Sequence, residues 1–241
     1  MGKLTSKEIY SIFLLHKTPE ILSKFYWSNY AFNGIDFNWD TWYLYNFQNN
    51  LTPRKSIDFS WKLFHGLLET ESKLKTWRKS DGVCRSCRTL GYVRQDQGEI
   101  VIENANHLLT SCSYRPKVWT MISQLIKEVF GHTIAITRLE IMTGYFRNDL
   151  DQNSCRLINM ILSMSRYNFW LSRNLIKHEN NIMGFKEFYL RLKHYILTHI
   201  QTLESSNTTD NIIKDKLSQV RDSLNTIFTS DVDENRVPSL F

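Results

Sequence analysis

The residues with the clearest chemistry are three cysteines and one histidine within a stretch of 29 residues. They form a Cys-x-x-Cys pair, a gap of 19 residues and a His-x(4)-Cys pair, and they are Cys84, Cys87, His107 and Cys112. Two thiolates separated by two residues can bind the same zinc ion, and zinc modules commonly use a gap of this length. Three thiolates and one imidazole complete a tetrahedron and leave no open position. The pattern therefore predicts one structural Zn²⁺.

Neighbouring residues add detail to this prediction. Gly82, just before the first cysteine, can supply the backbone freedom that such a turn needs. Because His107 and Cys112 are five residues apart, they cannot share one face of an unbroken α-helix, so we expect a helix over 104–110 with Cys112 in the following turn. A Cys-x-x-Cys pair is also typical of thioredoxin-like redox proteins, but no βαβ pattern surrounds it here. Cys155, on an apolar helical face, is expected to be a buried apolar residue rather than a ligand.

Most of the chain around these four residues is expected to be helical, because apolar residues recur at helical spacing along most of the sequence. Helices are expected over 5–16, 19–27, 39–47, 58–68, 71–77, 116–130, 153–178 and 185–201. Residues 81–103 differ, since a Gln-Asp-Gln-Gly turn at 95–98 separates two short apolar runs and predicts a β-hairpin. The expected fold is mainly α, a helical domain with a small zinc-stapled β-hairpin insert and a C-terminal amphipathic helix.

The last expected helix has a coiled-coil-like seam, with apolar residues alternating in steps of four and three. The seam consists of Ile213, Leu217, Val220, Leu224 and Ile227. The chain then divides into an N-terminal helical segment (1–52), a zinc-binding domain (53–120), a helical region (121–204), and a linker, amphipathic helix and acidic tail (205–241). A lone helix must bury such a seam on its own domain or on a second copy, so self-association through 208–228 is one expectation.

Charge is unevenly distributed along the 241 residues, which carry 30 Lys and Arg against 24 Asp and Glu. Residues 54–117 hold twelve basic and seven acidic groups, and residues 156–201 hold seven and two. Such segments can form a positive surface that meets phosphates, although they can also simply solvate helices. No apolar run approaches the roughly 18 residues of a membrane span, and the first residues do not read as a signal peptide. With only four cysteines, the chain is expected in a reducing compartment, the nucleus or cytoplasm, with no membrane partner.

Several of these residues together resemble a known family, the zinc-binding domain that follows the polymerase in LINE-type (non-LTR) retrotransposon reverse transcriptases. The matching features are a Trp-x-x-x-His-Gly stretch from Trp61 to Leu67, Leu74, the four expected ligands, Glu103, Leu108 and Trp119. Further on, Phe169-Trp170-Leu171-Ser172-Arg173-Asn174 is similar to a Trp-x-x-Arg-Asn helix near the end of such polyproteins. The close resemblance covers 58–120, and a looser one covers 1–180.

The resemblance implies an RNA- or DNA-holding module that acts on single strands or hybrids. The side chains expected to contact phosphates are Lys62, Lys73, Lys75, Arg78, Lys79, Arg85 and Arg88. Trp61 and Trp77 are expected mainly in the core, and any exposed aromatic, Tyr92 included, would be available to stack on bases. No Tyr-x-Asp-Asp turn, phosphate loop or other catalytic motif occurs, so we expect no enzymatic activity, no catalytic residues, and a fragment or domesticated remnant of such an element. The alternative is an interaction or scaffold protein that uses the C-terminal amphipathic helix.

Overall fold

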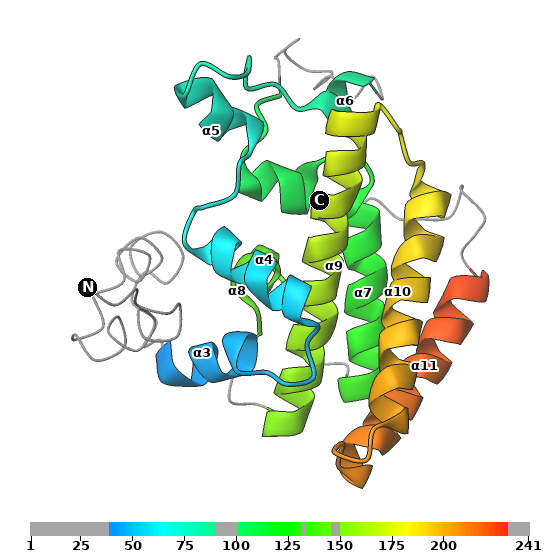
Figure 1. The fold of residues 1–241 in the computed structure, drawn as a ribbon. Helices are drawn as coiled ribbons and strands as arrows, with labels where there is room; N and C mark the ends of the chain where they lie inside the picture. The colour runs from blue at the N-terminus through cyan, green and yellow to red at the C-terminus, as the bar shows by residue number, and fades with distance from the viewer. Residues whose placement is uncertain (1–38, 90–100, 132–133, 146–149, 231–241) are drawn as a thin grey trace, which may run out of the picture.

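A long central helix organises the fold. The computed structural model describes residues 39–89, 101–131, 134–145 and 150–230. Helix α9 (Gln152–Glu179) lies between α3 (Trp39–Phe47) and α4 (Arg54–Phe64) on one side and α7 (Arg115–Phe130) and α10 (Phe185–Ser205) on the other (Figure 1). It begins where Asp151 accepts a hydrogen bond from the Ser154 amide, and it ends at Asn180 in the left-handed conformation. The mainly α class predicted from periodicity is confirmed.

Shorter elements make up one end of the molecule (Figure 1). They are α5 (Glu71–Thr76), α6 (Arg85–Thr89) and the π-helix η1 (His107–Ser111), with α8 (Arg138–Thr143) contacting η1. The predicted hairpin is not seen: residues 91–100 lie outside the described part, and within that part Ile102 forms only an isolated antiparallel bridge with Val83. The helices expected over 5–16 and 19–27 also lie outside the described residues.

One hydrophobic core joins segments that the sequence analysis had divided. It runs from Leu51 to Ile227 and takes buried residues from α4, η1, α7, α9, α10 and α11 (Asn211–Ser230). Segments 53–120, 121–204 and 205–241 therefore share a core in the described structure. Leu67, expected on the buried face of its helix, is 53% exposed because α4 ends at Phe64 and the chain turns at Gly66. No helix within the described residues is long and apolar enough to span a membrane.

The seam of the last helix is buried within the chain. Helix α11 packs against α7 and α10, and all five seam residues lie in the main core. The apolar face that motivated the expectation of self-association is thus already covered by the protein's own helices, as Figure 1 shows for α11 beside α10. The seam is therefore not available to a second copy in this fold.

We expect Val220→Ala to lower the free energy of unfolding by about 2 kcal/mol. Val220 is fully buried in the α11 seam, and each lost buried methyl group costs roughly 0.8 kcal/mol plus a cavity contribution. Gln219→Ala, on the exposed side of the same helix, is the control and should change stability by less than about 0.5 kcal/mol. Urea denaturation followed by circular dichroism measures both variants. Equal effects would contradict the burial of the seam.

Candidate metal centre

The four predicted ligands come together at the end of the molecule that carries α5 and α6. Their ligand atoms all lie within 4.8 Å of one another, and Cys84, Cys87, His107 and Cys112 are hereafter the Cys₃His cluster. The Cys112 Sγ lies 3.5 Å from the Cys84 Sγ and 3.7 Å from the Cys87 Sγ, and the Cys87 Sγ lies 3.4 Å from the His107 Nε2. Zinc–sulfur and zinc–nitrogen bonds of about 2.3 and 2.0 Å in a tetrahedron separate two sulfurs by about 3.8 Å and sulfur from nitrogen by about 3.5 Å. The spacing therefore fits a single tetrahedral metal ion.

Backbone contacts hold the first two ligands. The Cys84 amide donates to the carbonyl of Val101 at 2.8 Å, and the Glu103 amide donates to the carbonyl of Gly82 at 3.0 Å. Gly82 has φ +86°, so its freedom to adopt a left-handed conformation is used just before the first ligand, as predicted. Helix α6 starts directly after Cys84 and brings Cys87 round to the same side one turn later.

A π-helix places the second pair of ligands. The expected α-helical turn over 104–110 is instead η1, in which the Cys112 amide donates to the carbonyl of His107, five residues earlier, at 2.9 Å. This wider turn brings residues five apart to one side, which an α-helix cannot do. Cys112 follows the helix directly, as predicted, but its backbone is extended. The Trp119 indole N–H donates to the carbonyl of Leu109 at 2.6 Å and holds η1 against α7.

The imidazole of His107 has its two nitrogens in different roles. Nε2 faces the thiols, while Nδ1 lies 3.3 Å from the Ser111 hydroxyl. Metal-bound histidines ordinarily use their second nitrogen in this way, which fixes the ring orientation and tautomer. Cys155 is not part of the cluster: it is buried in α9, within the main core, as predicted.

The three thiols of the Cys₃His cluster have raised pKa values, because they are buried and lie within hydrogen-bonding distance of one another. The hydrogen bond with Cys112, together with burial, raises the pKa of Cys84 to about 12. A hydrogen bond with Cys112 lowers the pKa of Cys87, but the one with Cys84 and burial outweigh it and raise the value to about 11. For Cys112 the bond with Cys84 lowers the pKa, while the bond with Cys87 and burial raise it to about 11. A bound cation reverses this balance, because coordination deprotonates a thiol outright. Three thiolates and one imidazole are a donor set that suits Zn²⁺. In a site with no open coordination position, the metal would have a structural role and would crosslink the segments that carry its ligands.

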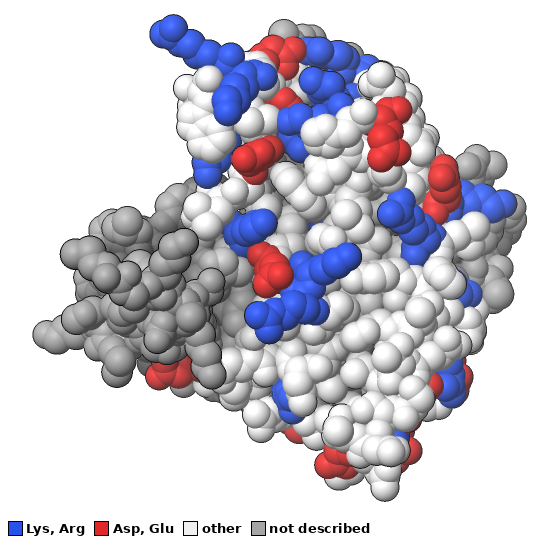
Figure 2. Space-filling view, viewed as in Figure 1, with Lys and Arg blue, Asp and Glu red and all other residues white. Residues whose placement is uncertain are grey.

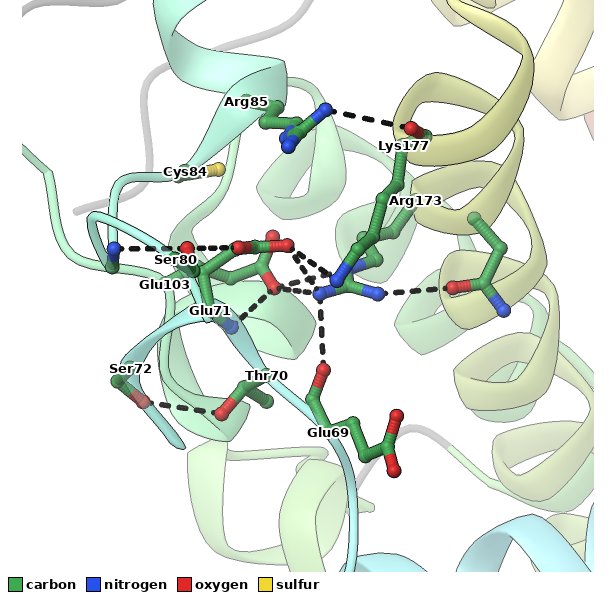
Figure 3. Close-up of polar contacts among 12 residues, drawn as sticks. Glu69, Thr70, Glu71, Ser72, Ser80, Cys84, Arg85, Glu103, Arg173 and Lys177 are labelled. Carbon is green, nitrogen blue, oxygen red and sulfur yellow. Dashed lines mark hydrogen bonds and ion pairs between the residues drawn. The ribbon is translucent and has the colours of Figure 1, made fainter. Parts of the chain in front are cut away.

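A buried ionic cluster lies beside the metal centre (Figure 3). The Arg173 guanidinium, from α9, donates to the Glu103 carboxylate at 2.9 Å, to the Glu71 carboxylate at 2.8 Å and to the carbonyl of Glu69 at 3.0 Å. Lys177, one helical turn further on, reaches the same Glu71 oxygen at 2.9 Å. We call Glu71, Glu103, Arg173 and Lys177 the ionic cluster. It fastens α5 and the strand-like segment before η1 to the central helix.

Hydrogen bonds keep the Glu71 carboxylate charged. Burial alone would raise its pKa, but the hydroxyl of Ser80 and the ammonium of Lys177 donate to it, and with the charge of Arg173 they bring the pKa below its ordinary value. No pattern in the sequence connects the four residues of the ionic cluster, although Glu103 and Arg173 each belong to the family resemblance. The available signal was an arginine within the strongly apolar stretch of α9.

The basic residues expected to contact phosphates lie mainly around α5 and α6. Lys75, Arg78, Lys79, Arg85 and Arg88 are exposed and Lys73 is half-buried; these six are hereafter the α5–α6 basic surface. Figure 2 shows Lys and Arg side chains gathered at this end of the molecule, with some acidic groups between them. One of the acidic groups is Asp81, whose carboxylate pairs with Arg88 at 2.6 Å. The seventh expected residue, Lys62, is exposed in the last turn of α4 instead.

Two tryptophans expected mainly in the core are exposed. Trp77 is 47% exposed at the end of α5, where the ammonium groups of Lys73 and Lys79 lie 5.4 and 5.7 Å from its ring centre. Trp61 is 38% exposed and packs on His65, with ring centres 3.9 Å apart. Helix α5 ends at Thr76 and the chain turns at Arg78, which has φ +56°, so Trp77 does not continue the buried helix face that Leu74 marks. Tyr92 lies outside the described residues.

Comparisons with known proteins add no relative: no protein-family model, no curated protein and no solved structure matches the chain.

Proposed function

We propose that this chain is a non-catalytic, zinc-stapled module that binds single-stranded RNA or DNA through the α5–α6 basic surface. The observation that carries the proposal is Trp77, an exposed indole with the ammonium groups of Lys73 and Lys79 near its ring, set among further exposed arginines and lysines. Proteins that bind single-stranded nucleic acid without sequence preference combine a basic surface that follows the phosphate backbone with aromatic side chains on which the bases stack. Duplex offers no such unpaired base faces, so single strands are the better fit.

The metal centre and the ionic cluster give this surface a fixed shape. Arg85 and Arg88 belong to α6, whose Cys87 is a ligand, and Arg85 also donates to the carbonyl of Lys177 at the end of α9. Glu71 is the first residue of α5, and its ion pair with Arg173 fixes this helix to α9. The proposal includes an origin in a LINE-type retroelement, which is supported by the sequence resemblance alone. It also includes a reducing compartment such as the nucleus or cytoplasm, which is supported by the free cysteines, since zinc binds thiolates and not disulfides.

The alternative of an interaction or scaffold role rests on the apolar seam of the C-terminal helix and on the acidic end of the chain. The seam is covered by α7 and α10 and offers this alternative no free apolar face. Concentration-dependent sedimentation of the whole chain would favour that alternative.

Trp77→Ala should weaken binding to a short labelled single-stranded RNA by about 5- to 150-fold, since one lost base–aromatic stack is worth roughly 1–3 kcal/mol. Trp77→Phe is the matched variant and should keep most of the affinity, because a smaller ring still stacks. Fluorescence anisotropy at low salt measures both.

Salt dependence tests the basic part of the same surface. Lys79→Ala should lower the slope of log K against log salt concentration by about 0.7, the value for one phosphate contact on a single strand. Lys127→Ala is the control and should leave the slope unchanged. Lys127 lies in the last turn of α7, about 18 Å along the helix from its first residue, and so lies away from the end of α7 that adjoins Cys112. A flat salt dependence of the unmodified protein, or no binding at low salt, would contradict the proposal.

A further inference from the structure

Arg115 is a buried charge for which the described residues provide no carboxylate. Arg115 is 1% exposed, and among the described residues its side chain makes one hydrogen bond, from Nη1 to the carbonyl of Cys112 at 3.3 Å. Its Nε and Nη2 are buried without a hydrogen-bond partner in the described part of the chain. An arginine keeps its proton in a protein, so its burial without a negative partner is costly, and a nearby negative charge would offset that cost.

The contacts of Arg115 do not supply that partner. The guanidinium carbon lies 5.2 Å from the ring centre of Phe169 and 5.8 Å from that of Tyr114. Ring faces attract a cation but carry no net charge, so they offset only part of the cost of its burial. The position of Arg115 in the chain adds to this cost, because it opens α7, where the helix dipole disfavours positive charge.

We propose that the negative partner of Arg115 is the metal–thiolate centre itself. The inference rests on the metal site proposed above. Zn²⁺ bound by three thiolates and a neutral imidazole carries one excess negative charge, and Arg115 follows the ligand Cys112 by three residues. The guanidinium on the Cys112 carbonyl and the positive end of α7 both stabilise that charge without touching the ion. Arg115 is thus a positioning and charge-balancing residue outside the set of ligands.

A second buried arginine provides a matched control. Arg166, in the middle of α9, is also 1% exposed and also has Nε and Nη2 without a partner in the described structure. Its hydrogen bond goes to the carbonyl of Met142 in α8, away from the Cys₃His cluster. Removing either arginine changes the core in a similar way, but only Arg115 adjoins the cluster.

The test is the zinc affinity of the whole chain, measured by competition with a chelator of known affinity. Arg115→Met should bind zinc about 10- to 100-fold more weakly, the usual size of an effect from outside the ligand set. Arg115→Lys keeps the charge and should recover most of the affinity, and Arg166→Met should leave it unchanged. With Co²⁺ as a spectroscopic probe, Arg115→Met should shift the sulfur-to-cobalt charge-transfer band to lower energy, because the thiolates become easier to oxidise.

Equal losses of affinity for Arg115→Met and Arg166→Met would overturn the inference and indicate a general effect on the core. Unchanged affinity and an unchanged cobalt band in Arg115→Met would also overturn it. If Arg115→Met does not fold, Arg115→Lys still decides, since a 10-fold or greater loss with the charge retained would contradict charge balance. An unmodified protein that binds no zinc would instead overturn the metal site, which separates the two failures.

Discussion

Replacing Cys87 by Ser should release the metal and unfold the described residues of the segment from Gly82 to Cys112. Structural zinc in small modules contributes an apparent binding free energy of about 10–16 kcal/mol near neutral pH. In the described part of that segment, the backbone pairing between its two halves is limited to an isolated bridge and a few hydrogen bonds, which cannot replace such a contribution. Helices α10 and α11 bury their own apolar faces and should keep most of their structure. Metal analysis and hydrogen exchange over 82–112 measure the two effects.

Cys155→Ser is the matched control, because Cys155 is the one cysteine of the sequence outside the Cys₃His cluster. It should leave the metal content at one equivalent, whereas Cys84→Ser, His107→Ala and Cys112→Ser should each lower it as Cys87→Ser does. Purified protein without stoichiometric zinc, or loss of zinc in Cys155→Ser but not in Cys87→Ser, would show that the ligand assignment is wrong.

Arg173→Met should lower the free energy of unfolding by about 3–5 kcal/mol. The substitution removes the guanidinium that pairs with the carboxylates of Glu71 and Glu103. Both glutamates are 1% exposed, so water cannot compensate for the lost positive charge. Breaking a buried ion pair from one side costs about this much because the remaining charge is uncompensated. Lys177 still reaches Glu71, so the residual penalty falls mainly on Glu103.

Arg88→Ala is the control for this variant. The Arg88–Asp81 pair has an N–O distance of 2.6 Å, which is shorter than the distances from Arg173 to its two carboxylates. The side chains of Arg88 and Asp81 are, however, both more than half exposed. Exposed pairs contribute about 0–1 kcal/mol. Chemical denaturation of the zinc-loaded protein measures both variants, and a loss below about 1 kcal/mol in Arg173→Met would contradict the role of the ionic cluster. The triple variant that also carries Glu71→Gln and Glu103→Gln should recover part of the lost stability.

Features that depend on local spacing could be predicted from the order of the residues. That the four residues of the Cys₃His cluster come together was predictable, because two of them form a local pair and the other two follow at a separation common in zinc modules. Helices α7, α9, α10 and α11 were predictable because each carries an apolar face at helical spacing over many turns, with Pro116 and Gly131 marking the ends of α7. Periodicity also identified the α11 seam, but it could not say whether the chain itself or a second copy covers that seam.

The contacts between residues far apart in the sequence could not be predicted in this way, because they depend on how the helices pack. Arg173 pairs with carboxylates 70 and 102 residues away, and nothing in local spacing connects them. The exposure of Trp77 was equally hidden, because it depends on how the short helix α5 is held against α9. The π-turn that brings His107 and Cys112 together forms where η1 packs on α7 and α9, while local pattern favoured an α-helix. Apolar periodicity records which face of a helix avoids water, whereas ion pairs, exposure and ligand geometry depend on which helix lies opposite, and that is set by the packing of the whole core.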